Sequence, residues 1–211
     1  MKTFKMRIVD IHTHNVNAEN ALISVAPDML PLHSTNCYSV GLHPWDTVSV
    51  TDSDLETLKT AALQNNVYAI GECGIDKLRG ASLEIQKKIF ENHIRLSEDL
   101  CKPLIIHQVK SIDEIFFYRK KYSPSQRWLI HGFRGNIITA KQLLKVGIEF
   151  SLGSKFVADI LQIIPMKSLF LESDDSSCFP SLLCNVAHLL SRSVQDLEQQ
   201  LVENNRSFLN L

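Results

Sequence analysis

The chain has 211 residues, of which 45% are hydrophobic and 21% charged, and its 22 basic and 23 acidic side chains leave a net charge of -1. This length supports one sizeable core rather than two full domains, and nothing in the balanced charge requires a nucleic-acid partner, which usually shows a basic excess or patch. The chain has no apolar run of about 18 residues, no apolar leader and no C-x-x-C pair among its five cysteines, which predicts a cytoplasmic protein without a membrane partner.

Eight short apolar runs predict eight β-strands. Helix-like segments lie between most of these runs, and that alternation is typical of βα units and a parallel sheet. In chain order, the predicted strands cover residues 7–11, 20–25, 37–42, 67–71, 103–106, 127–130, 147–152 and 168–172.

Helix-start signals follow the later strands. Only about eight residues separate the first two strands, too few for a crossover helix. The pattern therefore predicts an α/β fold, a TIM-like (β/α)8 barrel trimmed of one or two early helices, forming one domain over residues 1–211. The predicted helices begin near Thr51, Ser82, Ile112, Asn136 and Ser181.

Histidines and carboxylates recur at the ends of these apolar runs. Alternation along a strand sends His12 and His14 to the same face, where two imidazoles can bind one metal ion. Barrels of this kind carry their function at the carboxyl ends of the strands. The repetition therefore predicts a metal site at one end of the sheet. The further candidate ligands are Glu72, His107, His131 and Asp174.

Six ligands exceed what one catalytic ion needs, since a catalytic zinc commonly takes three. Two divalent ions bridged by a carboxylate fit the number better, and such a pair can stabilise both the attacking and the leaving oxygen of a displacement. Imidazole with carboxylate suits Zn²⁺, Mn²⁺ or Fe²⁺, whereas Mg²⁺ is a harder ion that prefers oxygen. The identity stays open, with Mg²⁺, Mn²⁺ and Zn²⁺ as the candidates.

Short motifs spread over nearly the whole chain resemble the TatD family of metal-dependent deoxyribonucleases, within the amidohydrolase-like barrels. Each motif is short, but their order and spacing together are specific. They are Asp10-Ile11-His12-Thr13-His14, Gly41-Leu42-His43-Pro44, Ala69-Ile70-Gly71-Glu72-Cys73-Gly74-Ile75-Asp76, Gln86 with Phe90, Pro103-Leu104-Ile105-Ile106-His107, Ile130-His131-Gly132-Phe133-Arg134-Gly135 and Leu171-Glu172-Ser173-Asp174.

The resemblance implies a division of the ligands between two ions. His12, His14 and Asp174 are implied to hold one ion, His107 and His131 the other, and Glu72 is implied to be shared. It also implies phosphodiester hydrolysis of DNA with a 3′-to-5′ exonuclease tendency. We expect Asp174 to orient or deprotonate the attacking water.

The residues expected around the substrate depart from the family pattern. Lys110 is the nearest cation after His107, where the family usually has an arginine, and Arg134 stands where the family has a small residue. His43, Lys110 and Arg134 are the candidates for holding phosphate, because cations and imidazoles beside a metal site can bind phosphate oxygens. A loop hydrogen bond is the alternative for His43. A small phosphoester, an amide or a lactone is the alternative substrate. Glu72 occupies the place of the bridging lysine that marks amidohydrolases, which favours a phosphoester.

Four neighbouring residues carry weaker expectations. Cys73 should face away from the site as a core thiol, and His93 should be a surface or packing residue. Asp76 is either a turn residue or part of the site. Trp45 is expected to pack, with stacking on a base as the alternative. A non-catalytic metal-binding scaffold is the remaining alternative for the whole chain, and no protein partner is evident.

Overall fold

A computed structural model describes residues 7–29, 33 and 35–211 of the protein. The expectation about an N-terminal leader falls on residues 1–6 and lies outside the described residues. Eight strands form a single sheet in the order of the chain, and every neighbouring pair is parallel. The strands are β1 (Asp10–Thr13), β2 (Ala21–Val25), β3 (Cys37–Val40), β4 (Val67–Asp76), β5 (Leu104–Val109), β6 (Trp128–Ile130), β7 (Ile148–Leu152) and β8 (Phe170–Leu171).

The barrel closes just beyond the short last strand. An isolated parallel bridge joins Thr13 to Asp174. The Asp174 N–H donates to the His12 carbonyl at 3.0 Å, and the His14 N–H donates to the Asp174 carbonyl at 3.2 Å. The predicted α/β barrel is confirmed, and its closure brings candidate ligands from the two ends of the chain together.

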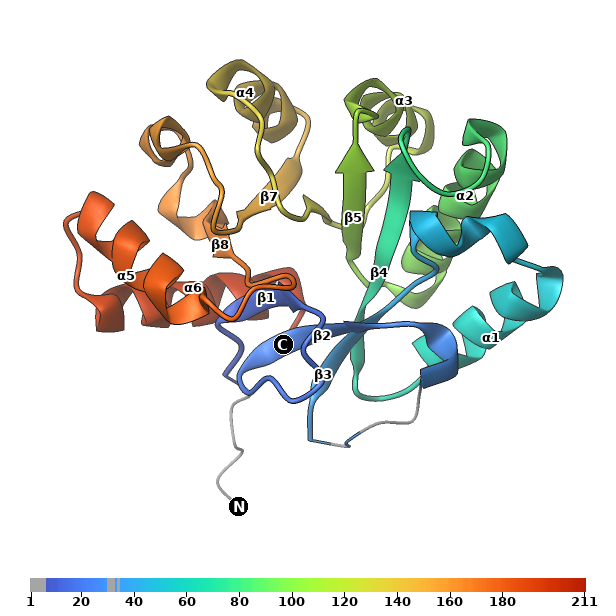
Figure 1. Ribbon diagram of the computed structural model, residues 1–211, viewed down its shortest axis with the longest axis horizontal. Helices are drawn as coiled ribbons and strands as arrows, with labels where there is room; N and C mark the ends of the chain where they lie inside the picture. Colours follow the sequence, from blue (N-terminus) through green and yellow to red (C-terminus); the bar gives the residue numbers. More distant parts are fainter. Residues whose placement is uncertain (1–6, 30–32, 34) are drawn as a thin grey trace.

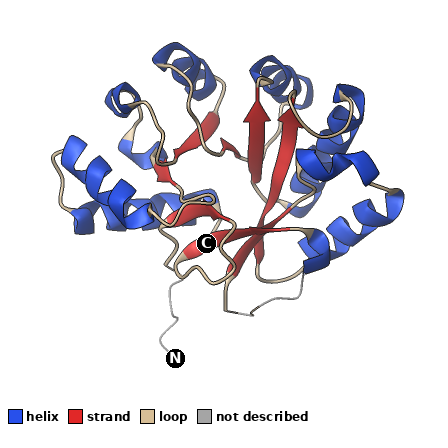
Figure 2. Ribbon diagram, in the orientation of Figure 1, coloured by secondary structure: helices blue, strands red, loops and turns tan. Residues whose placement is uncertain are grey.

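The part of the chain that the structure describes has six α-helices, and Figure 1 shows them on the outside of the strands. Among the described residues, a loop alone joins β1 to β2, and no α-helix lies between β2 and β3 (Figure 2). The helices are α1 (Asp52–Ala62), α2 (Leu83–Leu100), α3 (Ile112–Tyr122), α4 (Ile137–Lys145), α5 (Phe179–Leu189) and α6 (Val194–Phe208), with short 3-10 helices η1 (Pro27–Met29), η2 (Pro44–Ser49), η3 (Ala158–Gln162) and η4 (Met166–Ser168).

The trimming of the early helices is confirmed. Residues 14–20 lead directly from β1 to the parallel β2, without a helix. Seven extended residues reach roughly 23–25 Å, and a four-residue strand is only about 13 Å long, so a plain loop can return along it. The described part of the next connection contains only η1.

The predicted helix starts at Thr51, Ser82 and Asn136 are confirmed by their caps, α3 begins at Ile112 as expected, and α5 begins at Phe179 rather than at Ser181. The Asp54 carboxylate accepts the Thr51 N–H at 2.7 Å, the Ser82 hydroxyl accepts the Ile85 N–H, and Asn136 caps α4. The C-terminal helical region is two helices rather than one continuous helix. Ser193 begins the second of them by accepting the Asp196 N–H at 3.0 Å.

Two apolar clusters fill the molecule. The larger lies between the sheet and the helices, and Cys73 belongs to it, fully buried as expected. The smaller takes one residue from each of seven strands, among them Ile105, Leu129 and Phe170, and adds Phe208, the last residue of α6. Alternation then places the side chains two positions further along these strands on the same inner face.

Strand ends differ from the sequence expectation at β4. This strand continues to Asp76, five residues beyond its predicted end. Gln86 of α2 accepts the Asp76 N–H at 2.8 Å and donates to the Asp76 carbonyl at 3.0 Å, which holds the extension in place. None of the helices among the described residues is long and apolar enough to cross a membrane.

Candidate metal centre

One oxygen of the Glu72 carboxylate faces two imidazoles from the first strand. Oε2 lies 3.1 Å from His14 Nε2 and 3.3 Å from His12 Nε2. Asp174 reaches the same pair, with Oδ1 at 3.6 Å from His14 Nε2 and 3.8 Å from His12 Nε2. Two imidazoles and two carboxylates thus converge on one point at the carboxyl end of β1.

The other oxygen of Glu72 faces three imidazoles from different loops and strands. Oε1 lies 2.5 Å from His107 Nδ1, 2.7 Å from His131 Nε2 and 3.1 Å from His43 Nε2. His107 and His131 stand two residues beyond the inner-core residues Ile105 and Leu129, so the strand alternation itself turns them inward. Glu72 therefore separates two groups of ligands, one at each of its oxygens.

All six predicted metal ligands lie in this cluster. His43 joins them, although the sequence predicted for it a phosphate contact or a loop hydrogen bond. Its Nδ1 makes such a loop hydrogen bond by accepting the Trp45 N–H, and its Nε2 is aimed at the cluster rather than at the rim. Groups of ligand atoms close enough for one ion include His12 with His14 and Glu72, and His43 with Glu72 and His107.

Glycines allow the backbone to approach Glu72 closely. A Cβ on Gly41 would lie 2.4 Å from the Glu72 carbonyl oxygen, and one on Gly71 would lie 2.3 Å from the Ile105 carbonyl oxygen. Gly71 also has φ of +137°, a conformation that residues with a side chain rarely adopt. Glu72 thus occupies the interior of β4 because its neighbours have no side chains.

Carboxylates behind the cluster contact the outer nitrogens of two imidazoles. Asp76 Oδ2 is 3.3 Å from His107 Nε2, and Glu172 Oε1 is 3.5 Å from His131 Nδ1. Such partners orient metal-ligating histidines. Asp76 therefore belongs to the site. The sequence motifs assign no role to Glu172. It stands two residues beyond the inner-core residue Phe170, however, and this spacing indicates that its side chain faces inward.

Asp10 supports the first strand in a different way. Its Oδ1 accepts the N–H groups of His12 and Ser173, at 3.2 and 3.1 Å. Burial raises the pKa of the Asp10 carboxyl to about 7. This residue was also without a predicted role, because its function is to join β1 to the end of β8, and that contact exists only in the closed barrel.

The positive charge of His131 and the negative charges of Glu72 and Glu172 stabilise one another. Burial opposes ionisation of Glu72, but the positive His131 and hydrogen bonds from the imidazoles outweigh it and hold the pKa of Glu72 well below its usual range. Burial also opposes protonation of His131, but Glu72 and Glu172 outweigh it and raise the pKa of His131 well above its usual value. A cation at this point is what stabilises the buried carboxylates.

The donor set fits divalent metal ions. Both ring nitrogens of His12, Glu72 Oε2 and His131 Nδ1 are buried without a hydrogen-bond partner among the described residues. Unpaired buried polar atoms are costly, and imidazole with carboxylate suits Zn²⁺, Mn²⁺ and Fe²⁺. Of these atoms, His12 Nε2 and Glu72 Oε2 face each other at the carboxyl end of β1, whereas His131 Nδ1 is directed at Glu172.

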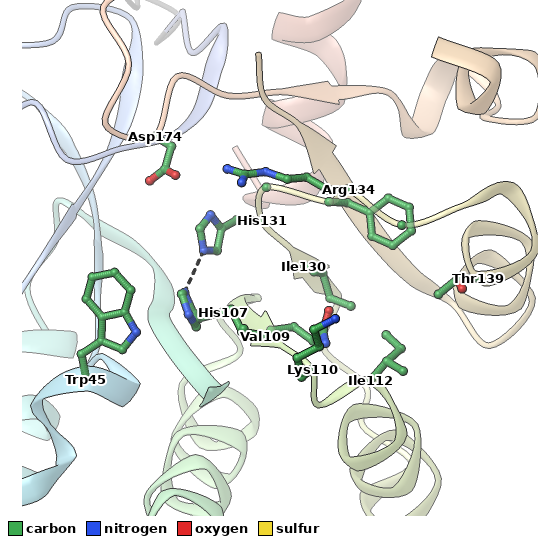
Figure 3. Close-up of a pocket in the computed structure, with 14 residues that line it drawn as sticks. Trp45, His107, Val109, Lys110, Ile112, Ile130, His131, Arg134, Thr139 and Asp174 are labelled. Carbon is green, nitrogen blue, oxygen red and sulfur yellow. Dashed lines mark hydrogen bonds between the residues drawn. The ribbon is translucent and has the colours of Figure 1, made fainter. Parts of the chain in front are cut away.

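A cavity of about 740 Å³ opens beside His107 and His131. Asp174, Lys110 and Arg134 line it, and both cationic residues are exposed. Figure 3 shows the His107–His131 pair between Trp45 and Arg134. The three predicted phosphate contacts thus divide: Lys110 and Arg134 lie at the cavity, and His43 lies within the cluster.

Comparison with known proteins relates the chain to one family. The family model described as "TatD related DNase" matches residues 28–210. The metal-dependent hydrolase YabD of Bacillus subtilis is 26% identical over 168 residues, which cover 75% of this chain and 66% of that protein. The 3′-5′ ssDNA/RNA exonuclease TatD of Klebsiella pneumoniae is 24% identical over 237 aligned positions, covering 98% of this chain and 90% of the relative.

The fold itself matches solved structures. The crystal structure of YjjV, a TatD homologue of Escherichia coli, superposes with a TM-score of 0.82 at 19% identity, covering 98% of this chain and 99% of that chain. In sequence, however, this chain spans only 66% of the length of YabD and 64% of the length of YjjV.

Proposed function

Because the chain belongs to the TatD related DNase family, we propose that it is a divalent-metal-dependent hydrolase that cleaves phosphodiester bonds of DNA. The observation that carries the proposal is the Glu72 carboxylate, which presents each of its oxygens to a separate group of imidazoles. A carboxylate in this position is suited to bridge two ions. The exonuclease name of the Klebsiella relative supports the choice of nucleic acid as substrate.

The ligands divide between two ions in this proposal. His12, His14 and Asp174 would hold one, His107 and His131 the other, and Glu72 would contact both. His43, which lies 3.1 Å from Glu72 Oε1, is a further candidate for the second group. When bound, such ions polarise a phosphoryl oxygen and lower the pKa of water.

Asp174 is the group best placed to handle a proton. Its side chain is 31% exposed and lines the cavity, whereas the Glu72 side chain is only 3% exposed. A water entering the cavity can therefore reach Asp174, whose carboxylate orients it toward the phosphate and accepts its proton. Arg134 and Lys110 supply charge at the rim, and the planar guanidinium of Arg134 can bind two phosphate oxygens at once.

Metal titration and a substrate panel test this function together. We expect the metal-free chain to bind two Mn²⁺ ions and then to cleave a single-stranded oligonucleotide and bis(p-nitrophenyl) phosphate, but not amide or lactone substrates. The His131→Gln variant should bind one ion fewer. Exposed His188, outside the cluster, provides the matched control His188→Gln, which should bind two.

The outcomes separate the alternatives. Cleavage of amides or lactones but not of phosphodiesters would assign the same site to another substrate class. Cleavage of small phosphoesters alone would restrict the substrate to short molecules. Metal binding without any hydrolysis would make the chain a scaffold, and a stoichiometry of one or less would contradict the two-ion site.

A further inference from the structure

Trp45 is a large aromatic side chain exposed at the rim of the candidate metal centre. It is 43% exposed, whereas Trp128, the other tryptophan of the chain, is fully buried. Trp45 belongs to η2, two residues after His43, and it lines the cavity beside His107 (Figure 3). An exposed indole at this place needs an explanation other than core packing.

Three contacts hold Trp45 in place, and two of them involve the indole ring. Its Nε1–H donates to Asp76 Oδ2 at 2.7 Å, and its backbone N–H donates to His43 Nδ1 at 3.1 Å. The guanidinium carbon of Arg79 lies 3.6 Å from the ring centroid, in cation–π geometry. Arg79 covers one face of the ring and Asp76 binds its N–H edge, while the His43 and His107 rings stand nearly perpendicular to the indole rather than stacked on it, so a stacking ring has the face opposite Arg79 available.

The ring also lies close to the cluster where the phosphate would bind. Its centroid is 4.8 Å from that of His43 and 5.8 Å from that of His107. A planar ring stacked on Trp45 would therefore stand beside the cluster around Glu72. The cavity of about 740 Å³ lies in the range of 300–1,000 Å³ that is usual for ligand sites.

We propose that Trp45, backed by Arg79, is a stacking platform for the nucleobase next to the scissile phosphate. This inference rests on the proposed function and narrows it to phosphodiesters that carry a nucleoside. Every base presents a π-face, so the platform selects for the presence of a base and tolerates its identity. The fixed orientation of the ring lowers the entropy lost on binding.

Tryptophan fluorescence tests stacking without hydrolysis. The tetranucleotide (dT)4, added to the parent chain in EDTA, should quench the exposed Trp45, while buried Trp128 supplies a constant background. The Trp45→Phe variant should show no quenching. Fluorescence of the parent chain that stays unchanged at saturating (dT)4 would overturn the proposal.

Two matched esters test how stacking on Trp45 affects turnover with Mn²⁺. The p-nitrophenyl ester of thymidine 5′-monophosphate and methyl p-nitrophenyl phosphate share the leaving group and differ in the nucleoside. Stacking of one base corresponds to roughly a tenfold to hundredfold preference in kcat/KM for the nucleoside ester. The Trp45→Leu variant should lose that preference, mainly through KM, and Trp45→Phe should keep part of it.

Controls separate stacking from a structural role. Val48 lies on the same 3-10 helix and is 73% exposed, so Val48→Thr should keep the parent's preference. If Trp45→Leu slows both esters equally, Trp45 only positions Asp76 and the proposal is wrong. If the parent cleaves neither ester, the proposed function fails, and the fluorescence titration still decides whether Trp45 stacks on a base.

Discussion

The Glu72 side chain is 3% exposed and is surrounded by five imidazoles, an arrangement that only a cation or shared protons can stabilise. Its two oxygens face different histidines, and Asp76 and Glu172 contact the far nitrogens of His107 and His131. At the scale of single residues, the site is therefore two layers of alternating carboxylate and imidazole. The inner layer contains the proposed metal ligands, and the outer layer fixes the rings.

Asp174→Asn tests the role given to the one partly exposed acid of the inner layer. Asn keeps the shape but cannot accept a proton and is a weaker ligand than a carboxylate. Loss of general base action alone lowers kcat by about 10²–10⁴-fold, and weaker metal binding adds to it. Steady-state kinetics at saturating Mn²⁺, together with metal content, give the measurement.

Asp159 offers a matched control for this substitution. It is exposed on η3, so Asp159→Asn should retain parental activity. Parental activity in Asp174→Asn, at full metal occupancy, would remove Asp174 from the proton transfer.

At the scale of elements, α2 supports the site from outside the sheet. Gln86 binds the end of β4, and His93 binds the loop that follows β3 by accepting the Leu42 N–H on Nε2 at 2.9 Å. The His93 Nδ1–H donates to the Ile89 carbonyl at 2.8 Å, so the ring is neutral and fully paired. His93 is thus a packing residue, which is one of the two roles predicted for it from the sequence.

His93 makes stability depend on pH. Burial lowers the pKa of His93 from 6.5 to about 4, so the unfolded chain binds the proton more tightly than the folded chain. Its contribution is complete above pH 6.5 and is lost as the pH falls toward 4. About 2 kcal/mol of unfolding free energy should be lost through this group between pH 7 and pH 5.

The His93→Gln variant isolates that effect, because the amide can accept the Leu42 N–H without titrating. Urea unfolding at pH 7 and pH 5 should show a fall in unfolding free energy that is about 2 kcal/mol smaller in the variant than in the parent. If the unfolding free energy falls equally in both proteins, His93 does not stay neutral in the folded chain.

At the scale of the whole molecule, the closed barrel joins ligands from Asp10–Thr13 to Asp174 in one site. The end of α6 reinforces the closure, since Asn205 donates to the carbonyls of Ile8 and Val9 at 3.0 Å. Metal ions bound at this junction would hold both ends of the chain. Their binding should therefore appear as global stability.

Metal removal should lower the melting temperature. A ligand at a hundred times its Kd stabilises the folded state by about 2.7 kcal/mol, which corresponds to a shift of about 5–10 °C for a chain of this size. Thermal unfolding with EDTA and with excess Mn²⁺ gives the measurement.

The matched variants are Glu72→Gln, which should lose most of the shift, and Glu203→Gln at an exposed position of α6, which should keep it. Equal melting temperatures of the parent with and without Mn²⁺ would contradict a metal site built into the closure.

The sequence by itself determined the eight strands, the helix starts at Thr51, Ser82 and Asn136, and six candidate metal ligands that the fold brings together. These features are local. Apolar periodicity, capping residues and short motifs each involve a few neighbouring positions, so they can be recognised in the sequence. The loss of the early helices was also predictable, because it depends only on the length between strands.

The tertiary structure alone decided which ligand faces which oxygen of Glu72, and it placed His43 in the cluster. The continuation of β4 to Asp76 depends on Gln86 of α2, and the roles of Asp10 and Glu172 depend on the closure of the barrel. These contacts join residues far apart in the chain, and their energies exist only when the sheet has curved to bring the strand ends together. Local patterns therefore could not contain them.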